Sequence, residues 1–542
     1  MLFVHTGARR LAAQMILANW VFAVMASLTH SYAHETDAVP KYSAETAHAP
    51  KPMPDRIVLT WEDNPATTQS VTWRTDASIV HARAQVAPAN ANGRALQPID
   101  VTAVTTPFQS DLNLAHYHTA SFKGLEPETL YAYRVGDGVN WSEYFHFKTA
   151  SSQSKPFSFI YFGDAQNDVR MHWSRVFREA FRDAPRAAFT LHAGDLIDVH
   201  SSDEEWGDWH HGPDWVNGTI PVIATPGNHE YRRINQGSPA LRIWRNRAQQ
   251  DVKVQVTGSE EVLTDAGKVR TITVLGPGGE LGMVRIDDGG KIIAVDQGLV
   301  DLVGYQEDAL VGTRFYRPPL SDRQQDPGEP AISLHWQHQF AFPEQEVPNH
   351  KLTESVYFID YQGTRFISLN SNEALEAQMP WLRKVLRNNP NRWTVVTFHH
   401  PVFSPAFDRD NPKLRQLWKP ILDEFKVDLV LSGHDHTYAR TGDVDVTLAA
   451  NAPSGYGQAY DPEIGTVYVV SVSGPKMYEI TKGSFAKRIA ENTQLYQIID
   501  IDGDTLRYRA FMATGELYDE FRLNKRSGLA NELVEVFPEH EN

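Results

Sequence analysis

After Ser158 the sequence alternates short apolar runs with amphipathic stretches, and this alternation limits the folds that the chain can adopt. The apolar runs, such as AAFTLHA, TVVTF and VDLVLS, have the length and β-branched content of buried strands. Apolar residues recur at helical spacing between them, in Trp173, Val176, Phe177, Ala180 and Phe181 and in Leu414, Leu417, Trp418, Ile421, Leu422 and Phe425. Strand–helix alternation predicts an α/β domain with largely buried sheets.

A different pattern comes before this region. Residues 55–150 contain short alternating runs such as RIVLTW, QSVTWRT and LYAYRV, with turn residues between them, which predicts a β-sandwich. A Gly-rich stretch at about 240–326, with runs typical of β-strands, is predicted to be an insertion, because the strands of the α/β domain resume only near Val356. We therefore expect a sandwich at 55–150, an α/β domain at 156–525 and a tail at 526–542.

The first 33 residues have the layout of a secretory signal. Arg9 and Arg10 come before a mostly apolar run at 11–28, and small residues surround the end of the segment at Ala33. We expect cleavage after Ala33, a linker at 34–54, and a protein that is secreted or periplasmic. The alternative is an uncleaved membrane anchor, although polar residues interrupt a run that is already near the lower length limit for a spanning helix.

Composition excludes several classes of site and partner. The chain has no cysteine, so any metal ion must be held by oxygen and imidazole ligands. Its formal net charge is −16, which argues against a nucleic-acid partner or an acidic membrane bound through a basic surface.

Five short polar motifs follow strands of the α/β domain: GDAQ (163–166), GDLID (194–198), GNHE (227–230), FHHP (398–401) and GHDH (433–436). Each alone has an ordinary explanation as a turn or a helix cap. Together they place carboxylate, amide and imidazole groups where ligands of open sheets collect. Such donors suit zinc, manganese and iron, and there are enough for two ions that share one carboxylate. Two ions can clamp an in-line displacement at phosphorus and acidify a bound water into hydroxide.

In their order, these motifs resemble the calcineurin-like metallophosphoesterases, and their details resemble the purple acid phosphatase branch. PDRIVLTWEDNPATTQSVTWRT and LEPETLYAYRVGD are similar to the sandwich of that branch, and GHDHTYAR is similar to its GHxHxYER run. The resemblance implies an α/β (α+β) two-sheet metallophosphoesterase sandwich, preceded by an N-terminal all-β domain of fibronectin type III type.

The resemblance also implies roles for residues, around two transition-metal ions (Fe, Zn or Mn). Asp195 would bridge the ions; the first would bind Asp164 and His436, and the second Asn228, His399 and His434. The family pattern prefers His399 to His400, which is left as an outer or alternative ligand. His229 would orient the phosphoryl group or protonate the leaving oxygen, and Arg440 would also contact substrate.

Two positions depart from the family pattern. Asp198 stands where purple enzymes have a tyrosine ligand, three residues after the bridging Asp, and Gln166 stands where many other members have the His of a DxH motif. The first ion therefore lacks both usual extra ligands. Either Gln166 or Asp198 could replace them, and Gln166 is favoured because it leaves the same strand end as Asp164.

The sequence therefore predicts an exported phosphoesterase with two metal ions, most simply an acid-phosphatase-like phosphomonoesterase that uses a metal-bound hydroxide, with His229 and Asp195 as catalytic residues. Its partner would be a small phosphorylated substrate. A phosphodiesterase is the alternative within the class, because the ligands do not encode the number of ester arms. A non-catalytic adhesion or binding protein with a degenerate site is the alternative of another class.

Three further patterns imitate functional sites. Residues 276–279 (GPGG) look like a phosphate loop but lead into a strand, so we expect a turn. Asp500, Asp502 and Asp504 imitate a calcium loop, but Phe511 occupies its twelfth position, so we expect a hairpin. His335 and His338 either border the cleft or lie on the surface.

Overall fold

The computed structural model describes residues 43–233, 242–245, 251–264, 267–275, 281–287, 292–303, 307–311, 330–347, 349–406, 409–444, 453–480 and 483–536. The chain divides into two units, Met1–His48 and Ala49–Asn542. The described part of the first unit contains the short helix α2 (Ala44–Ala47), and the predicted signal segment 1–33 lies outside the described residues. None of the helices described has both the length and the apolar character needed to cross a membrane.

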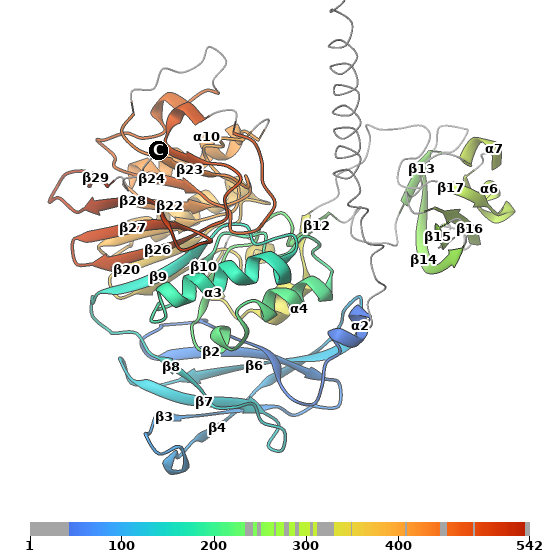
Figure 1. Cartoon of the computed structure of the whole chain (residues 1–542), viewed down its shortest axis with the longest axis horizontal. Coiled ribbons are helices and arrows are strands. Elements are labelled where there is room, and N and C mark those ends of the chain that lie inside the picture. The colour runs from blue at the N-terminus through green and yellow to red at the C-terminus, as the bar shows by residue number, and fades with distance from the viewer. Residues whose placement is uncertain are drawn as a thin grey trace, which may run out of the picture. The chain divides into compact units, whose positions relative to one another are not determined.

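Residues 55–148 form two antiparallel four-stranded sheets that share one core (Figure 1). Their orders are β1-β2-β6-β5 and β4-β3-β7-β8. The strands are β1 (Asp55–Thr60), β2 (Thr68–Asp76), β3 (Arg83–Pro88), β4 (Ile99–Thr102), β5 (Val104–Gln109), β6 (Leu114–Lys123), β7 (Leu130–Gly136) and β8 (Phe145–Lys148). Trp73 and Phe122 of one sheet and Tyr133 of the other belong to the shared core. The prediction of an N-terminal β-sandwich is confirmed.

The region that follows contains two seven-stranded mixed sheets, of order β11-β10-β9-β26-β27-β28-β29 and β19-β20-β21-β22-β24-β23-β25. The first contains β9 (Phe157–Phe162), β10 (Thr190–His192), β11 (Val222–Ala224), β26 (Leu495–Asp502), β27 (Thr505–Met512), β28 (Leu517–Asn524) and β29 (Glu532–Val536). The second contains β19 (Tyr357–Tyr361), β20 (Thr364–Ser368), β21 (Trp393–Thr397), β22 (Leu429–Ser432), β23 (Tyr438–Thr441), β24 (Val467–Val470) and β25 (Ala486–Ala490). One core joins the sheets, with Phe159 and Leu191 from the first and Val395 from the second.

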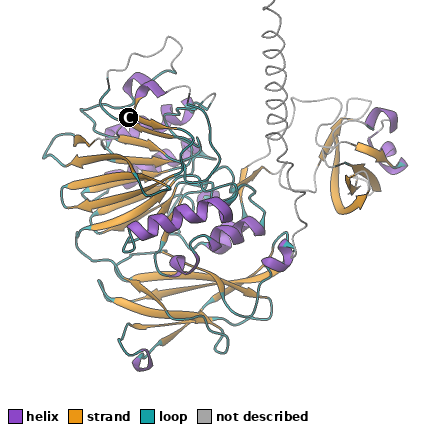
Figure 2. Cartoon of the chain, viewed as in Figure 1, coloured by secondary structure: helices purple, strands orange, loops and turns teal. Residues whose placement is uncertain are grey.

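Helices pack beside the two large sheets and beside the sandwich (Figure 2). They are α3 (Ser174–Asp183), α4 (Asp203–His211), α8 (Leu334–Gln339), α9 (Leu375–Arg387) and α10 (Pro412–Glu424). Helices α9 and α10 bury Leu382 and Trp418 against the face of the second sheet that carries Val396 and Val430. Both predicted amphipathic helices are present as α3 and α10, and strands buried on both faces explain why their sequences read as continuous apolar runs.

The predicted insertion has its own antiparallel sheet in its described parts. The strands β13 (Arg242–Arg245), β14 (Asp251–Thr264), β15 (Gly267–Leu275), β16 (Leu281–Ile286) and β17 (Ile292–Val295) lie in that order, and the helices α6 (Gln297–Val303) and α7 (Glu307–Leu310) follow them. On either side of the insertion, β12 (Tyr231–Arg233) pairs with β18 (Pro330–Ile332). The exact domain boundaries stay predictions.

The structure describes one of the imitation sites, the aspartates at 500–504, and only the segment that follows another, residues 276–279. Residues 276–279 lie outside the described residues, but the segment after them is the strand β16, as expected. The aspartates at 500–504 lie at the tight β26–β27 hairpin, where Asp502 pairs with Thr505, so the hairpin is confirmed.

A buried ionic cluster joins the sandwich to the α/β region. Asp203, at the start of α4, pairs with Arg56 Nη1 at 2.6 Å and with Arg74 Nη1 at 3.2 Å. His335 Nε2 lies 3.4 Å from Asp203 Oδ1. All four side chains are at most 4% exposed. Burial favours the neutral acid, but His335 and the two guanidinium groups hold the pKa of Asp203 well below its usual range. His335 is therefore part of a junction, and His338 stacks on Tyr117 of the sandwich.

We predict that Asp203→Asn lowers the free energy of unfolding by about 3–5 kcal/mol at neutral pH, because it leaves the buried Arg56 guanidinium without a carboxylate and removes one of the two carboxylates of Arg74. Urea unfolding measures this change. The stabilisation by Asp203 should be complete above the ordinary Asp pKa of about 3.9 and lost as the pH falls further through the lowered native pKa.

Asp55→Asn is the matched control, because Asp55 also pairs with Arg74 but is 38% exposed. It should cost much less, since exposed pairs contribute about 0–1 kcal/mol. Equal losses in the two variants would contradict a central role for Asp203.

Candidate metal centre

Loops after five parallel strands converge at the carboxyl edges of the two sheets. Asp164 follows β9, Asp195 follows β10, Asn228 follows β11, His399 follows β21, and His434 and His436 follow β22. Parallel strands end at the same edge of a sheet, and the shared core brings the edges of both sheets together. The structure therefore brings together the side chains that the five motifs contribute.

Two glycines allow the loops to approach this closely. A Cβ on Gly227 would lie 2.1 Å from Asp195 Oδ1, and a Cβ on Gly433 would lie 2.0 Å from Asp164 Oδ1. Neither distance is compatible with a side chain, so these glycines of the GNHE and GHDH motifs are required by packing at the site.

Asp195 lies at the centre of the group. Its buried carboxylate has Oδ2 3.1 Å from His399 Nε2 and 3.2 Å from Gln166 Nε2, and its Oδ1 accepts the His229 backbone N–H at 2.8 Å. Burial disfavours its charge, but His399 and His229 hold the pKa of Asp195 well below its usual range. Asp195 is therefore held as an anion in the protein interior.

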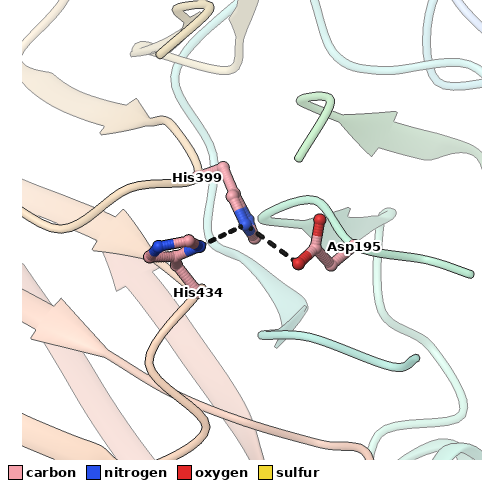
Figure 3. A group of neighbouring side chains, drawn as sticks. All are labelled: Asp195, His399 and His434. Carbon is pink, nitrogen blue, oxygen red and sulfur yellow. Dashed lines mark hydrogen bonds and ion pairs between the residues drawn. The ribbon is translucent and has the colours of Figure 1, made fainter. Parts of the chain in front are cut away.

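On one side of Asp195 lie His399, His434 and Asn228. His399 Nε2 is 3.1 Å from His434 Nδ1 and 3.1 Å from Asn228 Oδ1, and Figure 3 shows His399 between Asp195 and His434. His399 Nδ1 donates to the carbonyl of Ala193 at 2.9 Å, which directs Nε2 toward the group. His434 Nδ1 and Asn228 Oδ1 thus lie around the His399 nitrogen that contacts Asp195 Oδ2.

On the other side lie Asp164, His436 and Gln166. His436 Nε2 is 3.2 Å from Asp164 Oδ2 and 2.7 Å from Gln166 Nε2, while His436 Nδ1 donates to the carbonyl of Lys476. Asp164 Oδ2 and Gln166 Oε1 are buried without a hydrogen-bond partner. Buried acceptors in this state are costly unless a cation or a donor occupies the site.

Among the residues that the structure describes, there are two candidate ligand sets, Asp195 with His399 and His434, and Asp164 with Asp195 and His436. In each set the possible ligand atoms lie within 4.8 Å of one another, and Asp195 belongs to both. Oxygen and imidazole donors with unpaired buried oxygens fit transition-metal ions.

The protonation of the histidines reflects the local excess of negative charge. Burial alone would lower the pKa of His399, but the charges of Asp195 and Asp164 raise it to about 9. Burial and the neighbouring histidines lower the pKa of His400 to about 3 and that of His434 well below its usual value. The site attracts one positive charge at His399 and keeps His400 and His434 neutral, which is the form of imidazole that binds metal ions.

His229 and Asp198 lie at the edge of the group. His229 Nδ1 donates to the Asp198 carbonyl at 2.5 Å, and its Nε2 lies 4.0 Å from Asp195 Oδ2. The side chains are 26% and 35% exposed, so both reach solvent. The Asp198 carboxylate lies 3.4 Å from His229 Nδ1 and belongs to neither ligand set. His400 is also outside both sets, and its Nδ1 lies 2.8 Å from Ser371 Oγ.

The substrate contact predicted for Arg440 is at odds with its position. Its guanidinium is fully buried and pairs with Asp519 at 2.7 and 2.9 Å and with Glu535 at 3.0 and 2.8 Å. Both edges of the group are occupied by carboxylates. Arg440 therefore has no free face for a substrate phosphate and instead joins β23 to β28 and β29.

Sequence reasoning gave no role to Glu230, although it closes the GNHE motif. Its buried carboxylate accepts the backbone N–H groups of Asp195, Leu196 and Gly227 at 2.9, 2.7 and 2.6 Å. It ties together the two loops that carry Asp195 and Asn228. A carboxylate beside a predicted ligand was the available signal, but its direction could not be predicted.

Arg409 was also missed, because no motif surrounds it. Its Nη2 donates to the His434 carbonyl at 2.8 Å, and its Nε lies 3.1 Å from Asp435 Oδ1. With 27% of its side chain exposed, Arg409 adds positive charge at the rim of the group. Tyr478 packs its ring 4.5 Å from the His436 ring and lies under the Arg409 guanidinium.

Two known protein families match the sequence of this chain. Residues 54–149 match the N-terminal domain of purple acid phosphatases, and residues 158–300 and 314–438 match the calcineurin-like phosphoesterases. The chain belongs to the calcineurin-like phosphoesterases. Within this family it is purple-acid-phosphatase-like, with the N-terminal domain of that branch. The predicted family is confirmed.

Similar curated proteins match in short stretches. Purple acid phosphatase 17 of Arabidopsis thaliana is 26% identical over 135 residues, which cover 25% of this chain and 40% of that protein. An uncharacterized protein of Mycobacterium tuberculosis is 39% identical over 70 residues, which cover 12% of this chain and 13% of that protein. Probable inactive purple acid phosphatase 1 of A. thaliana is 25% identical over 140 residues, or 23% of each chain. The chain thus matches less than half the length of each.

Two solved structures share the fold. A purple acid phosphatase from yellow lupin (Lupinus luteus) seeds has a TM-score of 0.59 at 16% identity, over 88% of this chain and 75% of that one. A structure of PhoD has a TM-score of 0.50 at 12% identity, over 88% of this chain and 91% of that one. The predicted fold class, an α/β two-sheet sandwich after an all-β domain, is confirmed.

We predict that the iron-loaded protein shows no intense visible charge-transfer band, because Asp198 replaces the tyrosine ligand of the purple enzymes. Absorption spectroscopy after iron loading measures this. An intense band would contradict the prediction, and its loss in Tyr478→Phe would identify the ring beside His436 as the source.

Proposed function

We propose that the chain hydrolyses phosphate esters, most simply phosphomonoesters, at a centre of two metal ions. The observation that carries this proposal is that the single buried carboxylate of Asp195 belongs to both ligand sets. A carboxylate that belongs to two ligand sets can hold a pair of metal ions about 3.5–4 Å apart.

The proposed ligands follow the two sides of Asp195. Asp164, Gln166 and His436 would hold one ion, and Asn228, His399 and His434 the other. Gln166 fits better than Asp198, because it is buried beside His436 and Asp195 whereas Asp198 faces His229. A half-turn of its amide would exchange Nε2 for Oε1 and present an oxygen in place of the donor.

Metal ions bound here would supply positive charge for the phosphate oxygens and an acidified water as nucleophile. The chain's own residues do the rest. Glu230 holds the loops of Asp195 and Asn228 in register through three backbone N–H groups. The bond from His229 Nδ1 to the Asp198 carbonyl fixes that ring, and Nε2 lies 4.0 Å from Asp195 Oδ2 at the metal centre. A proton on Nε2 can there be donated to the leaving alkoxide oxygen.

The rim contributes positive charge without a metal ion. Arg409 is fixed by Asp435 and by the His434 carbonyl, so its guanidinium stays beside the ligand loop. In a chain of net charge −16, this local charge favours the approach of an anionic substrate. We place the reaction outside the cytoplasm because of the signal pattern at 1–33, and a purified protein that begins after Ala33 would support this.

A non-catalytic protein is the other candidate. Gln166 and Asp198 depart from the family pattern, and two of the similar proteins are named probable inactive purple acid phosphatases. Metal content measured together with phosphoesterase activity separates the two candidates.

For the enzyme, we predict that the protein contains transition metal, that chelation abolishes hydrolysis, and that added metal restores it.

Asp195→Asn should lower both metal content and activity by orders of magnitude, because it removes the charge shared by both ions. Phosphomonoester and phosphodiester substrates should be assayed side by side to establish the preference. Protein without metal or activity under any metal loading, or full turnover in Asp195→Asn, would contradict the proposal.

We further predict that Gln166→Ala lowers the metal content toward one ion per chain, whereas Asp198→Asn keeps two. Gln166 offers a buried oxygen without a hydrogen-bond partner, while Asp198 is one-third exposed and outside both ligand sets. Elemental analysis of the two purified variants measures this. The opposite result would assign Asp198 as the replacement ligand.

A further inference from the structure

A cavity of about 300 Å³ lies at the opposite edge of the second sheet from the metal centre. Its lining includes Arg392, which directly precedes β21, and Asp428, which directly precedes β22. The metal-centre residues follow the other ends of these strands. Since a strand rises about 3.3 Å per residue, the two sites are separated by the length of the strands.

Four basic side chains line this cavity together with a single carboxylate: Arg392, Lys426, Lys525, Arg526 and Asp428. We refer to the cavity as the basic pocket. The concentration of positive charge is unexpected in a chain with a net charge of −16. Clefts lined by one sign of charge raise the local concentration of the opposite ion.

The carboxylate and one lysine form a fixed floor. Asp428 is buried and accepts the Thr394 backbone N–H at 2.8 Å, Asn531 Nδ2 at 2.6 Å and Lys525 Nζ at 2.5 Å. Lys525 Nζ also lies 4.6 Å from the centre of the Trp393 ring. Asp428 therefore neutralises the charge of Lys525 and pairs with none of the other basic side chains that line the pocket.

Those other cations have little compensation. Among the residues that the structure describes, Lys426 and Arg526 form no ion pair, and Arg526 Nε donates to the Ala530 carbonyl at 2.9 Å. Arg392 pairs with Asp504, whose side chain is 63% exposed. An exposed ion pair of this kind is weak, so an incoming anion can compete for Arg392.

Lys426 has a backbone conformation that favours glycine. It follows α10 with φ of +48°, and the bonds Lys426 N to Asp423 O and Val427 N to Leu422 O form a Schellman cap. A side chain in this conformation is less stable than in the usual right-handed one. The Lys426 side chain is exposed and lines the basic pocket.

One wall is apolar. Phe425 and Ile464 are partly buried there, and Leu529 is 64% exposed although it lines the cavity. A ligand that combined an anionic group with an apolar part would cover this surface as well as satisfy the cations.

We propose that the basic pocket binds a small phosphorylated organic compound, with its phosphate on Lys426, Arg526 and Arg392 and its apolar part against Phe425 and Leu529. The site is separate from the metal centre and does not depend on the proposed hydrolysis. Guanidinium and ammonium groups are the side chains that proteins use for phosphate oxygens.

The test is isothermal titration calorimetry of the full-length protein with phenylphosphonate, which has no ester bond, and with inorganic phosphate at the same ionic strength. We expect a phenylphosphonate site that is present in the wild type and retained in Asp195→Asn. The double substitution Lys426→Gln/Arg526→Gln should weaken it by at least about tenfold, since it removes two charged hydrogen-bond donors to the phosphonate.

The double substitution Lys123→Gln/Lys148→Gln is the matched control, because it removes the same charge from exposed strand positions of the sandwich. It should leave the site unchanged, and thermal unfolding checks that both double variants fold. Phenylphosphonate should bind more tightly than phosphate; equal affinities would overturn the assignment to an organic ligand. Absence of binding in Asp195→Asn, or unchanged binding in Lys426→Gln/Arg526→Gln, would overturn the site itself.

Discussion

Two carboxylates, those of Asp164 and Asp195, are buried within the described structure without a lysine or arginine partner, and the organisation of the centre depends on this constraint. Anions in the protein interior need positive charge nearby. Only imidazoles are supplied, and a single histidine cannot balance two carboxylates. The converging loops, the unpaired Asp164 Oδ2 and the neutral His434 together fit the charge of bound cations. In a chain without cysteine, oxygen and imidazole groups are the ligands that remain.

Much of the fold and the grouping of the site could be predicted from the sequence. The apolar runs locate the strands, and a polar residue directly after a buried strand lies at a known edge of its sheet, which is why Asp195 and His399 could be expected to meet. The direction of a side chain could not be predicted. Arg440 follows the GHDH motif but points into the core toward Asp519, and Arg409 reaches the site from a loop without any motif. Such contacts depend on tertiary packing between segments that are distant in sequence.

The sandwich is integrated with the α/β region rather than simply attached to it. Besides the cluster around Asp203, Thr72 Oγ1 donates to the Gln339 carbonyl at 2.5 Å, and Tyr133 OH donates to the Gly218 carbonyl at 2.7 Å. Helix α4, which begins at Asp203, also carries Glu205, whose carboxylate accepts the backbone N–H groups of Asp198 and Val199. The junction is thus connected to the loop that holds His229 through its bond to the Asp198 carbonyl.

The backbone bonds to Glu230 have a consequence for how the protein is assembled. Three backbone N–H groups from the loops of Asp195 and Asn228 donate to the carboxylate of Glu230, and none of these bonds involves a metal ligand atom. The loops are therefore positioned by the folded polypeptide itself. At the proposed metal centre, an ion could then leave or be exchanged without releasing these loops, unlike in small domains whose folding requires the ion. Metal availability in the surroundings, rather than the folding pathway, would then determine which ions the centre contains.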